Sequence, residues 1–221
     1  MLQWPGRSRR AAKGSVWPAA LACAFLWCFA VTATPQGTET PLEAVRETVT
    51  QVLRILNDPA LKHQAKHAQR RRMLEEIAAS RFDYAEMSKR VLGSYWKQLT
   101  EIQRKEFVEV YTSFLSDKYA GRIEDYTGRK QEVGYLAERI EGSYAEVRTE
   151  LRSEKMTLPM DYRLLVKDVR WSGYDIIIDG VSLVSNYRSQ FQKIIRDSSY
   201  EELVKNLQER SISAEDTKRK P

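Results

Sequence analysis

The sequence predicts an α+β fold in which helices pack on one face of a curved, four-stranded antiparallel sheet. Up to about residue 124 the hydrophobic residues recur at the spacing of amphipathic helices. Between residues 133 and 179 they occupy every second position, in runs separated by turn-length gaps, which indicates an antiparallel meander. Two more helical patterns follow. This order is typical of α+β domains, and helices on one side of a curved sheet form a cone that can enclose an apolar pocket.

The first 33 residues have the composition of a secretory signal peptide. A basic stretch, 7–13, precedes an apolar run, 16–31, and Val31-Thr32-Ala33 provides small residues for cleavage. The apolar run is shorter than the roughly 20 residues of a membrane-spanning helix. We therefore expect a cleavable signal peptide over 1–33 and a polar linker over 34–39, with an uncleaved membrane anchor as the alternative.

Composition restricts the chemistry of the exported part. The chain has 221 residues and a net charge of +6, and its two cysteines, Cys23 and Cys28, lie inside the apolar run. The exported part therefore has no cysteine for a disulfide, a nucleophile or a thiolate ligand. The positive charge belongs partly to the leader, because the basic stretch 7–13 lies in it, and overall charge does not indicate a nucleic-acid site.

Local capping signals set the ends of three predicted helices. Thr40-Pro41-Leu42-Glu43 has the form of a capping box with proline at the first helical position, and Asp58-Pro59 ends this helix. Asp83 can cap a short helix that ends before Gly93. Thr100-Glu101-Ile102-Gln103 forms another capping box, which opens the longest predicted helix, 100–124.

A further helix, predicted over 62–79, is strongly basic at its start. The simplest interpretation of these charges is a solvated helix face. The alternative is a docking site for anionic headgroups or for an acidic partner. The basic side chains concerned are Lys62, Lys66, Arg70, Arg71 and Arg72.

The strand pattern consists of four runs, 133–137, 144–151, 157–166 and 174–179. In the last run, Asp175 and Asp179 share one strand face and could form a pair of carboxylates for acid–base chemistry, but alternation with Ile176 and Ile178 favours the solvent face. The chain then closes with two helices. They are predicted over 185–196 and 200–208, and we expect the polar tail, 209–221, to be disordered.

The residues that could carry chemistry do not form a recognisable active site. His63 and His67 have a spacing that could bind a metal, but no third ligand is evident and the basic residues around them repel a cation. The sequence contains neither a glycine-rich phosphate loop nor a nucleophile elbow. We therefore expect no enzyme activity, cofactor or metal. The hydrophobic pattern alone does not distinguish a closed core from a pocket.

Two long blocks resemble the signatures of the Mla-type periplasmic phospholipid-shuttle family, also called the toluene-tolerance auxiliary family. The first is RFDYAEMSKRVLGSYW, at 81–96, and the second is YDIIIDGVSLVSNYRSQF, at 174–191. Two such blocks in the family's order are more specific than a short motif. The resemblance extends over about 40–208. The sequence departs from the family at Asp179, where glutamate is more common, and at Val169-Arg170, where a turn glycine is expected; that hairpin should differ in shape.

The resemblance implies a phospholipid-binding domain over 40–208, with a cone related in shape to the nuclear-transport-factor type. The implied function is a monomeric periplasmic carrier of intact phospholipid. It would exchange lipid between an outer-membrane lipoprotein complex and an inner-membrane ABC-type lipid transporter, with no nucleic-acid partner and no covalent chemistry. A hopanoid-linked branch of the family makes a hopanoid-type cargo an alternative, and an enzyme built on the same cone is a second one.

Periodicity predicts which apolar residues can line a lipid pocket, some of them on helices and others on strands. The candidates are Val91, Leu92, Val110, Phe114 and Leu115 on helices, and Val147, Leu151, Met160, Tyr162, Leu164, Ile176 and Ile178 on strands. Signature residues are expected to have structural roles first. Phe82, Trp96 and Tyr187 are predicted to be packing anchors, and Arg81 and Asp83 to form a local ion pair and a helix cap.

Overall fold

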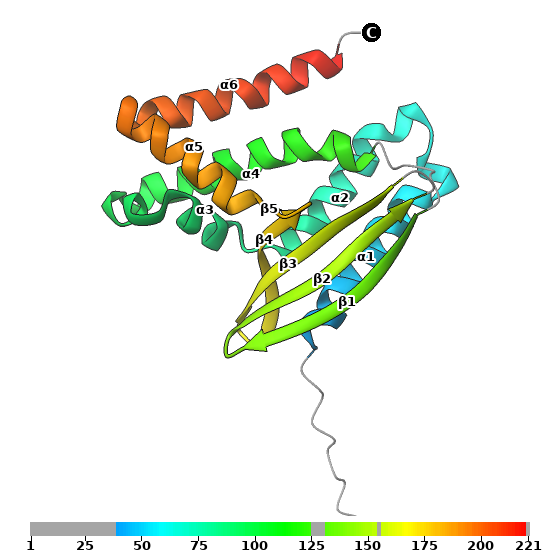
Figure 1. The fold of residues 1–221 in the computed structure, drawn as a ribbon. Helices are drawn as coiled ribbons and strands as arrows, with labels where there is room; N and C mark the ends of the chain where they lie inside the picture. The colour runs from blue at the N-terminus through cyan, green and yellow to red at the C-terminus, as the bar shows by residue number, and fades with distance from the viewer. Residues whose placement is uncertain (1–38, 125–130, 154–155, 220–221) are drawn as a thin grey trace, which may run out of the picture. The chain divides into compact units, whose positions relative to one another are not determined.

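The strands of the sheet follow one another in chain order, each antiparallel to the next (Figure 1). The computed structural model describes residues 39–124, 131–153 and 156–219, with side chains up to Glu209 for nearly all of them. The predicted signal peptide, 1–33, lies outside the described residues. The strands are β1 (Gln131–Glu141), β2 (Tyr144–Ser153), β3 (Thr157–Lys167), β4 (Arg170–Ile178) and β5 (Val181–Ser182).

The α+β prediction is confirmed, and the strand count needs one correction. The described sheet has five strands, because the two residues of β5 pair with the end of β4. A strand this short has no periodicity, so alternation could not reveal it. The four longer strands lie where the period-2 pattern predicts them.

Six helices and three short 3₁₀ turns complete the described part. Both capping boxes are present: the Glu43 N–H donates to Thr40 Oγ1, and the Gln103 N–H donates to Thr100 Oγ1. The predicted helix starts are therefore accurate at these two places. The elements are α1 (Pro41–Asn57), η1 (Pro59–Leu61), η2 (Gln64–Lys66), α2 (His67–Arg81), α3 (Tyr84–Leu92), η3 (Gly93–Gln98), α4 (Glu101–Glu124), α5 (Leu183–Asp197) and α6 (Tyr200–Arg219).

Two helix boundaries differ from the prediction. The segment from Lys62 to Lys66 is not the start of α2, because η1 and η2 precede the helix. At the other end of the chain, α6 continues to Arg219, where the sequence predicts a helix end at Gln208 and a disordered tail. The prediction of disorder rested on the polar composition of this segment, whereas its backbone is helical as far as Arg219.

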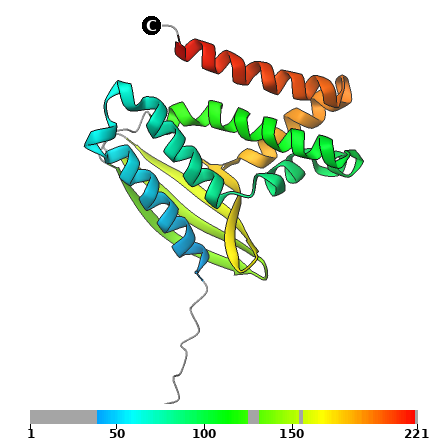
Figure 2. The same cartoon turned by 180° about the vertical axis from the view of Figure 1, so that it is seen from behind.

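The buried side chains form three separate clusters. The largest joins α3, α4, α5 and α6, a second packs α1 on the sheet, and a third joins α1 to α2. Seen from behind, α1 crosses one face of the sheet, while the other helices gather beyond the sheet (Figure 2). Aromatic rings dominate the largest cluster, whose most buried side chains include Phe107, Tyr111, Tyr187 and Leu203.

Strand β4 differs from its neighbours because helices contact both of its faces. Trp171 packs in the cluster with α1, and Phe82 lies against Gly173. On the opposite side Asp175 bonds to the start of α5. A Cβ at Gly173 would lie 2.7 Å from Phe82 Cε1, so only glycine admits this close approach.

Candidate functional site

The predicted pocket residues on the helices belong to a closed core. Val91 and Leu92 have no exposed surface, and Phe114 and Leu115 are buried with them in the largest cluster. Val110 is half-buried and packs against the same cluster. These side chains are already covered by α5 and α6 neighbours, so they are packing residues in this structure.

The predicted residues on the strands share one face of the sheet. The register pairs Val147 with Tyr162, and Tyr162 with Ile176. Met160 is paired with Ile178 in the same way. Because directly opposite residues point to the same side, the alternation assigned all of them to the correct common face.

Burial divides this face into a closed part and an open part. Val147 and Leu164 are buried in the cluster with α1. The remaining apolar residues are only half-buried, and none of them is a member of the three clusters formed by the described residues. We call them the open apolar face. Its members are Val133, Leu151, Leu158, Met160, Ile176 and Ile178.

Tyr162 lies at the border between the two parts. It packs against the cluster with α1 and is half-buried, and its hydroxyl donates to Met160 Sδ over 3.1 Å. Burial raises the pKa of the Tyr162 hydroxyl well above its ordinary value. Tyr162 is thus largely enclosed but keeps some exposed surface, as expected for a side chain at the inner end of the open apolar face.

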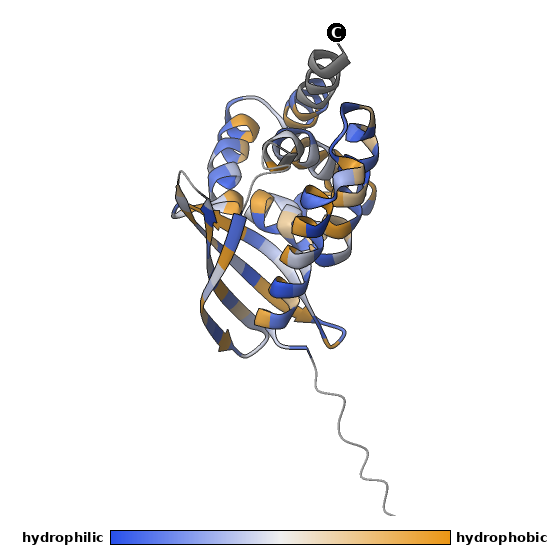
Figure 3. Cartoon of the chain, turned by 90° about the vertical axis from the view of Figure 1, so that its right-hand side faces the viewer, coloured by the Kyte–Doolittle hydropathy of each residue, from blue (hydrophilic) through white to orange (hydrophobic). Residues whose placement is uncertain are grey.

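Sequence reasoning missed some apolar residues that are also only half-buried. Leu158 belonged to the alternating pattern of its strand but was not selected as a candidate. Helices α1 and α2 contribute Val52, Leu53, Met73 and Ile77, all half-buried. Helical spacing revealed the α1 residues as apolar, but spacing does not show which of them remain uncovered. Figure 3 shows hydrophobic and hydrophilic residues alternating along the strands.

The RFD signature connects α2 and α3 to the sheet. The Asp83 carboxylate accepts from the Glu86 N–H at 2.9 Å and from Lys167 Nζ at 3.0 Å, while its backbone N–H donates to the Gly173 carbonyl. The predicted helix cap is therefore confirmed. Arg81 pairs with Glu39 and Glu47, so it takes no part in the ion pair of Asp83.

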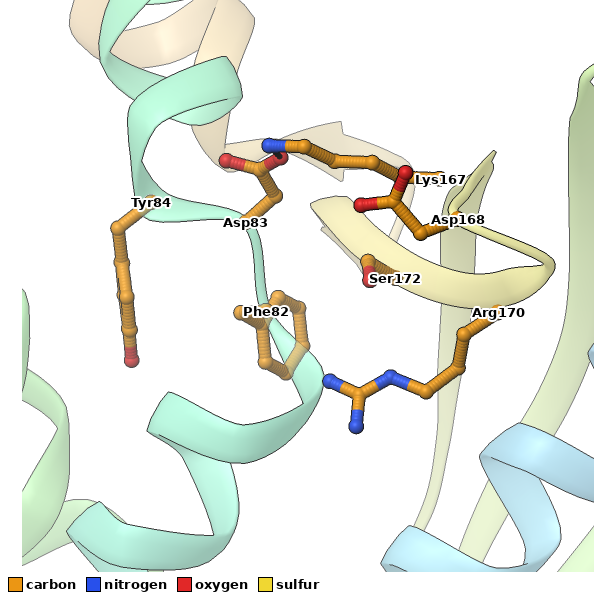
Figure 4. A pocket seen from close by; sticks show the side chains of 7 residues that line it. All are labelled: Phe82, Asp83, Tyr84, Lys167, Asp168, Arg170 and Ser172. Carbon is orange, nitrogen blue, oxygen red and sulfur yellow. Dashed lines mark hydrogen bonds and ion pairs between the residues drawn. The ribbon is translucent and has the colours of Figure 1, made fainter.

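A pocket of about 400 Å³ lies beside this signature (Figure 4). Four of its seven lining residues are charged, and Figure 4 shows the Lys167 side chain extending to Asp83. Charged groups in a wall disfavour a hydrocarbon chain, because they would lose hydration without gaining a partner. None of the predicted lipid-pocket residues lines this pocket. The lining residues are Phe82, Asp83, Tyr84, Lys167, Asp168, Arg170 and Ser172.

The other signature aromatics lie in the largest cluster, as predicted. Tyr187 is 1 % exposed and makes edge-to-face contacts with Tyr111 and Phe114. Phe82 and Trp96 are half-buried and pack against the same cluster. These three residues are packing anchors.

The interpretation of Asp175 as a solvent-face residue is wrong. Asp175 is 2 % exposed, and its carboxylate accepts from Ser182 Oγ at 2.6 Å and from the Val184 N–H at 3.0 Å. It therefore holds the start of α5, because four N–H groups at a helix start lack partners within the helix. Alternation gave the correct side of the strand, but α5 covers that side. Asp179 is exposed in a turn, so the two carboxylates do not form a pair.

The described residues contain neither a metal-binding cluster nor a helix suited to span a membrane. There, no three His, Cys, Asp or Glu side chains come together in a group that could hold a metal ion. No described helix combines the length and the apolar character needed to cross a bilayer. His63 precedes η2 and His67 begins α2.

Comparisons with known proteins agree on one family. The profile of the family described as MlaC protein matches residues 46–209. The intermembrane phospholipid transport system binding protein MlaC of Haemophilus influenzae is 23% identical over 124 residues, which are 54% of this chain and 58% of that protein. The chain thus matches little more than half the length of this curated relative.

A solved structure shares the fold. It is the phospholipid-binding protein from Ralstonia solanacearum in complex with a phospholipid, with a TM-score of 0.68 and 26% sequence identity. The superposition covers 77% of this chain and 96% of that one. The similarity therefore extends over most of this chain and nearly all of the phospholipid-binding protein.

Proposed function

The chain belongs to the MlaC protein family, and from this premise we propose that it is a carrier that binds the acyl chains of a phospholipid on the open apolar face. The observation that carries the proposal is the row of half-buried apolar side chains on one sheet face, which no core cluster covers. Two relatives are named for phospholipid transport or binding, and one of them holds a phospholipid.

The energetics of hydrocarbon exposure favour such a site. Burying one CH₂ group contributes about 0.8 kcal/mol, so two chains of about fifteen such groups would cost on the order of 24 kcal/mol to expose to water. A carrier must therefore enclose most of the chain length. We place the chains between the open apolar face and the half-buried apolar residues of α1 and α2, because both surfaces keep part of their apolar area exposed.

The headgroup needs no burial, because water solvates its charges better than an apolar site does. We propose that it remains in solvent, so that the protein tolerates different headgroups. Binding of this kind involves no covalent step, and we propose that the protein is not an enzyme. A hopanoid-type cargo is the alternative that the apolar character of the same site also fits.

The cellular part of the proposal follows the family. We infer that the protein works in the periplasm after removal of residues 1–33. It would carry lipid between an outer-membrane lipoprotein complex and an inner-membrane ABC-type lipid transporter. The measured intact mass of the exported protein tests the cleavage: a mass that retains the first 33 residues contradicts it.

The test uses a matched pair of leucines on one strand. Leu158 and Leu165 are both half-buried in β3, but they point to opposite faces because their positions differ by an odd number. Leu158→Glu places a charge in the proposed acyl-chain site, and Leu165→Glu places it on the other face. The protein is purified without detergent, and bound lipid is measured by native mass spectrometry and organic extraction.

We expect stoichiometric bound phospholipid with the wild type and with Leu165→Glu. Lipid occupancy should be at least about tenfold lower with Leu158→Glu, because an unpaired charge is costly among hydrocarbon chains. A polycyclic lipid in the extract would keep the carrier function and change the cargo class. Wild-type protein that is free of lipid and takes up no added phospholipid would refute the proposal. Equal loss in both variants would place the site elsewhere.

A further inference from the structure

The segment between α1 and α2 carries a group of exposed cations that the packing does not use. Between Pro59 and Leu74 the chain contains five Lys and Arg residues and no Asp or Glu. The sequence left open whether this run is a solvated face or a docking site. In the structure, the run separates into side chains that stabilise the fold and side chains that point into solvent.

Two arginines of the run have structural partners. Arg70 is 5 % exposed, and its Nη1 donates to the Leu61 carbonyl at 2.6 Å. Arg71 bonds to Glu75 and Asp117, which connects α2 to α4. Leu61 is itself buried in the cluster between α1 and α2. The Arg70 contact ties η1 to the first turn of α2 and so braces the turn between α1 and α2.

The remaining cations lie on this braced turn and on the adjoining parts of α1 and α2. Lys62 and Lys66 are exposed, as are Arg54 in the last turn of α1 and Arg72 on α2. Arg72 pairs with Glu76, whereas Arg54, Lys62 and Lys66 form no salt bridge with any other described residue. The nearest acid in the chain, Asp58, directs its carboxylate to the Ala60 N–H. We call Arg54, Lys62, Lys66 and Arg72 the basic tip.

The basic tip lies at the uncovered end of the open apolar face. Along β2, Ala145, Val147 and Thr149 are buried, whereas Leu151, the next residue on this side, is only half-buried. Cover therefore decreases toward the end of β2. In Figures 1 and 2 the cyan segment that contains η1 and η2 lies beside this same end of the sheet.

We propose that the basic tip docks the protein on the anionic surface of a phospholipid bilayer. Such a surface attracts clusters of Lys and Arg without requiring a shaped groove. A protein partner would instead be expected to meet exposed aromatic or aliphatic anchors. No residue between Arg54 and Arg72 is among the exposed large hydrophobics of the described part. The basic tip thus presents several charges without an apolar anchor. The phosphate groups of a membrane complement a surface of this kind.

Docking at this place would point the uncovered end of the open apolar face toward the bilayer, where a lipid leaves or enters. In this sense the inference deepens the proposed function. The binding step itself, however, depends on charge and does not require bound lipid, so the two proposals are tested by separate readouts.

The test compares two pairs of neutralised lysines. Lys62→Gln with Lys66→Gln removes charge from the basic tip. Lys105→Gln with Lys205→Gln removes the same charge from exposed positions on α4 and α6. Co-sedimentation is measured with phosphatidylcholine vesicles, with and without phosphatidylglycerol, and the bound lipid of each variant is extracted as above.

We expect the wild type to bind phosphatidylglycerol vesicles, more weakly as salt is raised, and not phosphatidylcholine alone. The tip variant should bind about 25-fold more weakly, the factor for two basic residues worth about 1 kcal/mol each. The control variant should stay within about twofold of the wild type, and both should retain their bound lipid.

Equal weakening in the two variants would assign binding to net charge and overturn the inference. Absence of vesicle binding would overturn it as well, and retention on a polyaspartate resin in that case would assign the tip to an acidic protein. A wild type that neither holds nor takes up phospholipid, but still binds anionic vesicles through the tip, would refute the carrier function and leave the docking inference standing.

Discussion

The turn between β3 and β4 holds two consecutive non-glycine residues in the left-handed region. Asp168 has a φ of 50° and Val169 a φ of 62°. A two-residue turn with positive φ at both positions matches the twist of the strands and favours Asp-Gly. The sequence has Asp-Val, and the structure keeps this turn geometry instead of changing the hairpin. Aspartate tolerates the conformation, whereas a β-branched residue is strained in it.

Val169→Gly should therefore stabilise the protein. Val169 is 79 % exposed, so its removal loses little apolar burial. Relief of backbone strain outweighs the added flexibility of the unfolded chain, and we expect the free energy of unfolding to rise by about 1 kcal/mol. Urea denaturation gives the value. Val181→Gly, at an exposed position in β5, should destabilise instead; a loss in both variants would show that Val169 is unstrained.

For Asp175, the sequence predicted the side of the strand but not the burial of the side chain. The alternation in β4 correctly separated Asp175 from Ile176, so the side of the strand was predictable. The burial of that side was not, because it depends on α5 returning to the sheet. Only the contact between Asp175 and the Val184 N–H makes the carboxylate a structural group.

At the scale of elements, Asp83 joins α3 to the end of β3. Burial alone raises the pKa of the Asp83 carboxyl, but the Glu86 N–H and the Lys167 ammonium outweigh it, and the pKa is lowered. A carboxyl whose pKa is lowered in the folded state stabilises the protein above the pKa of the unfolded chain, about 3.9. This contribution is lost as the pH falls through the folded-state pKa.

Two substitutions separate the cap from the charge. Asp83→Asn keeps a capping oxygen and should cost about 0.5 kcal/mol at neutral pH, since Lys167 is largely exposed. Asp83→Ala should cost about 1.5 kcal/mol, because the Glu86 N–H also loses its partner. Urea denaturation between about pH 7 and pH 2 should show the deficit of Asp83→Asn closing in acid. A deficit that stays constant with pH would contradict a lowered pKa.

Helix starts were predictable where the capping residues and the helix are contiguous in sequence. Thr40 and Thr100 form their capping bonds within three residues, and both helix starts were correct. The start of α2 was not predictable, because its N-cap residue, Lys66, makes no side-chain capping bond that the sequence could signal. Element boundaries thus follow from sequence to the extent that their hydrogen bonds are local.

For the molecule as a whole, periodicity identified the apolar faces but not their cover. Periodicity predicted Val91 and Val147 as pocket residues on the same grounds as Met160 and Ile178. The structure buries the first two in clusters and leaves the second two half-buried. The difference arises from where α1, α5 and α6 pack, which is tertiary information. The candidate site could therefore be predicted as a face of the sheet, and not as a set of residues.

This division predicts where bound lipid protects the backbone from hydrogen exchange. If acyl chains lie on the open apolar face, loading delipidated protein with phospholipid should slow exchange in α1, in α2 and in the parts of β2 and β3 near Leu151 and Met160. Ligand binding stabilises the states that hold the ligand and suppresses their local opening. The closed cluster around Val91 and Leu203 gains no new contact, so its exchange should change little.

Exchange followed by mass spectrometry on peptides from both regions makes the comparison within one experiment, with the α3 and α6 peptides as internal controls. Uniform slowing over all peptides would indicate a general rise in stability and no localised site. Selective slowing of α3 and α4 would mean that the helical cluster opens to admit the lipid, and the pocket would then be the one the helix periodicity predicts, around Val91, Leu92 and Phe114. Slowing confined to α1, α2 and the sheet is the result that the uneven burial of the sheet face requires.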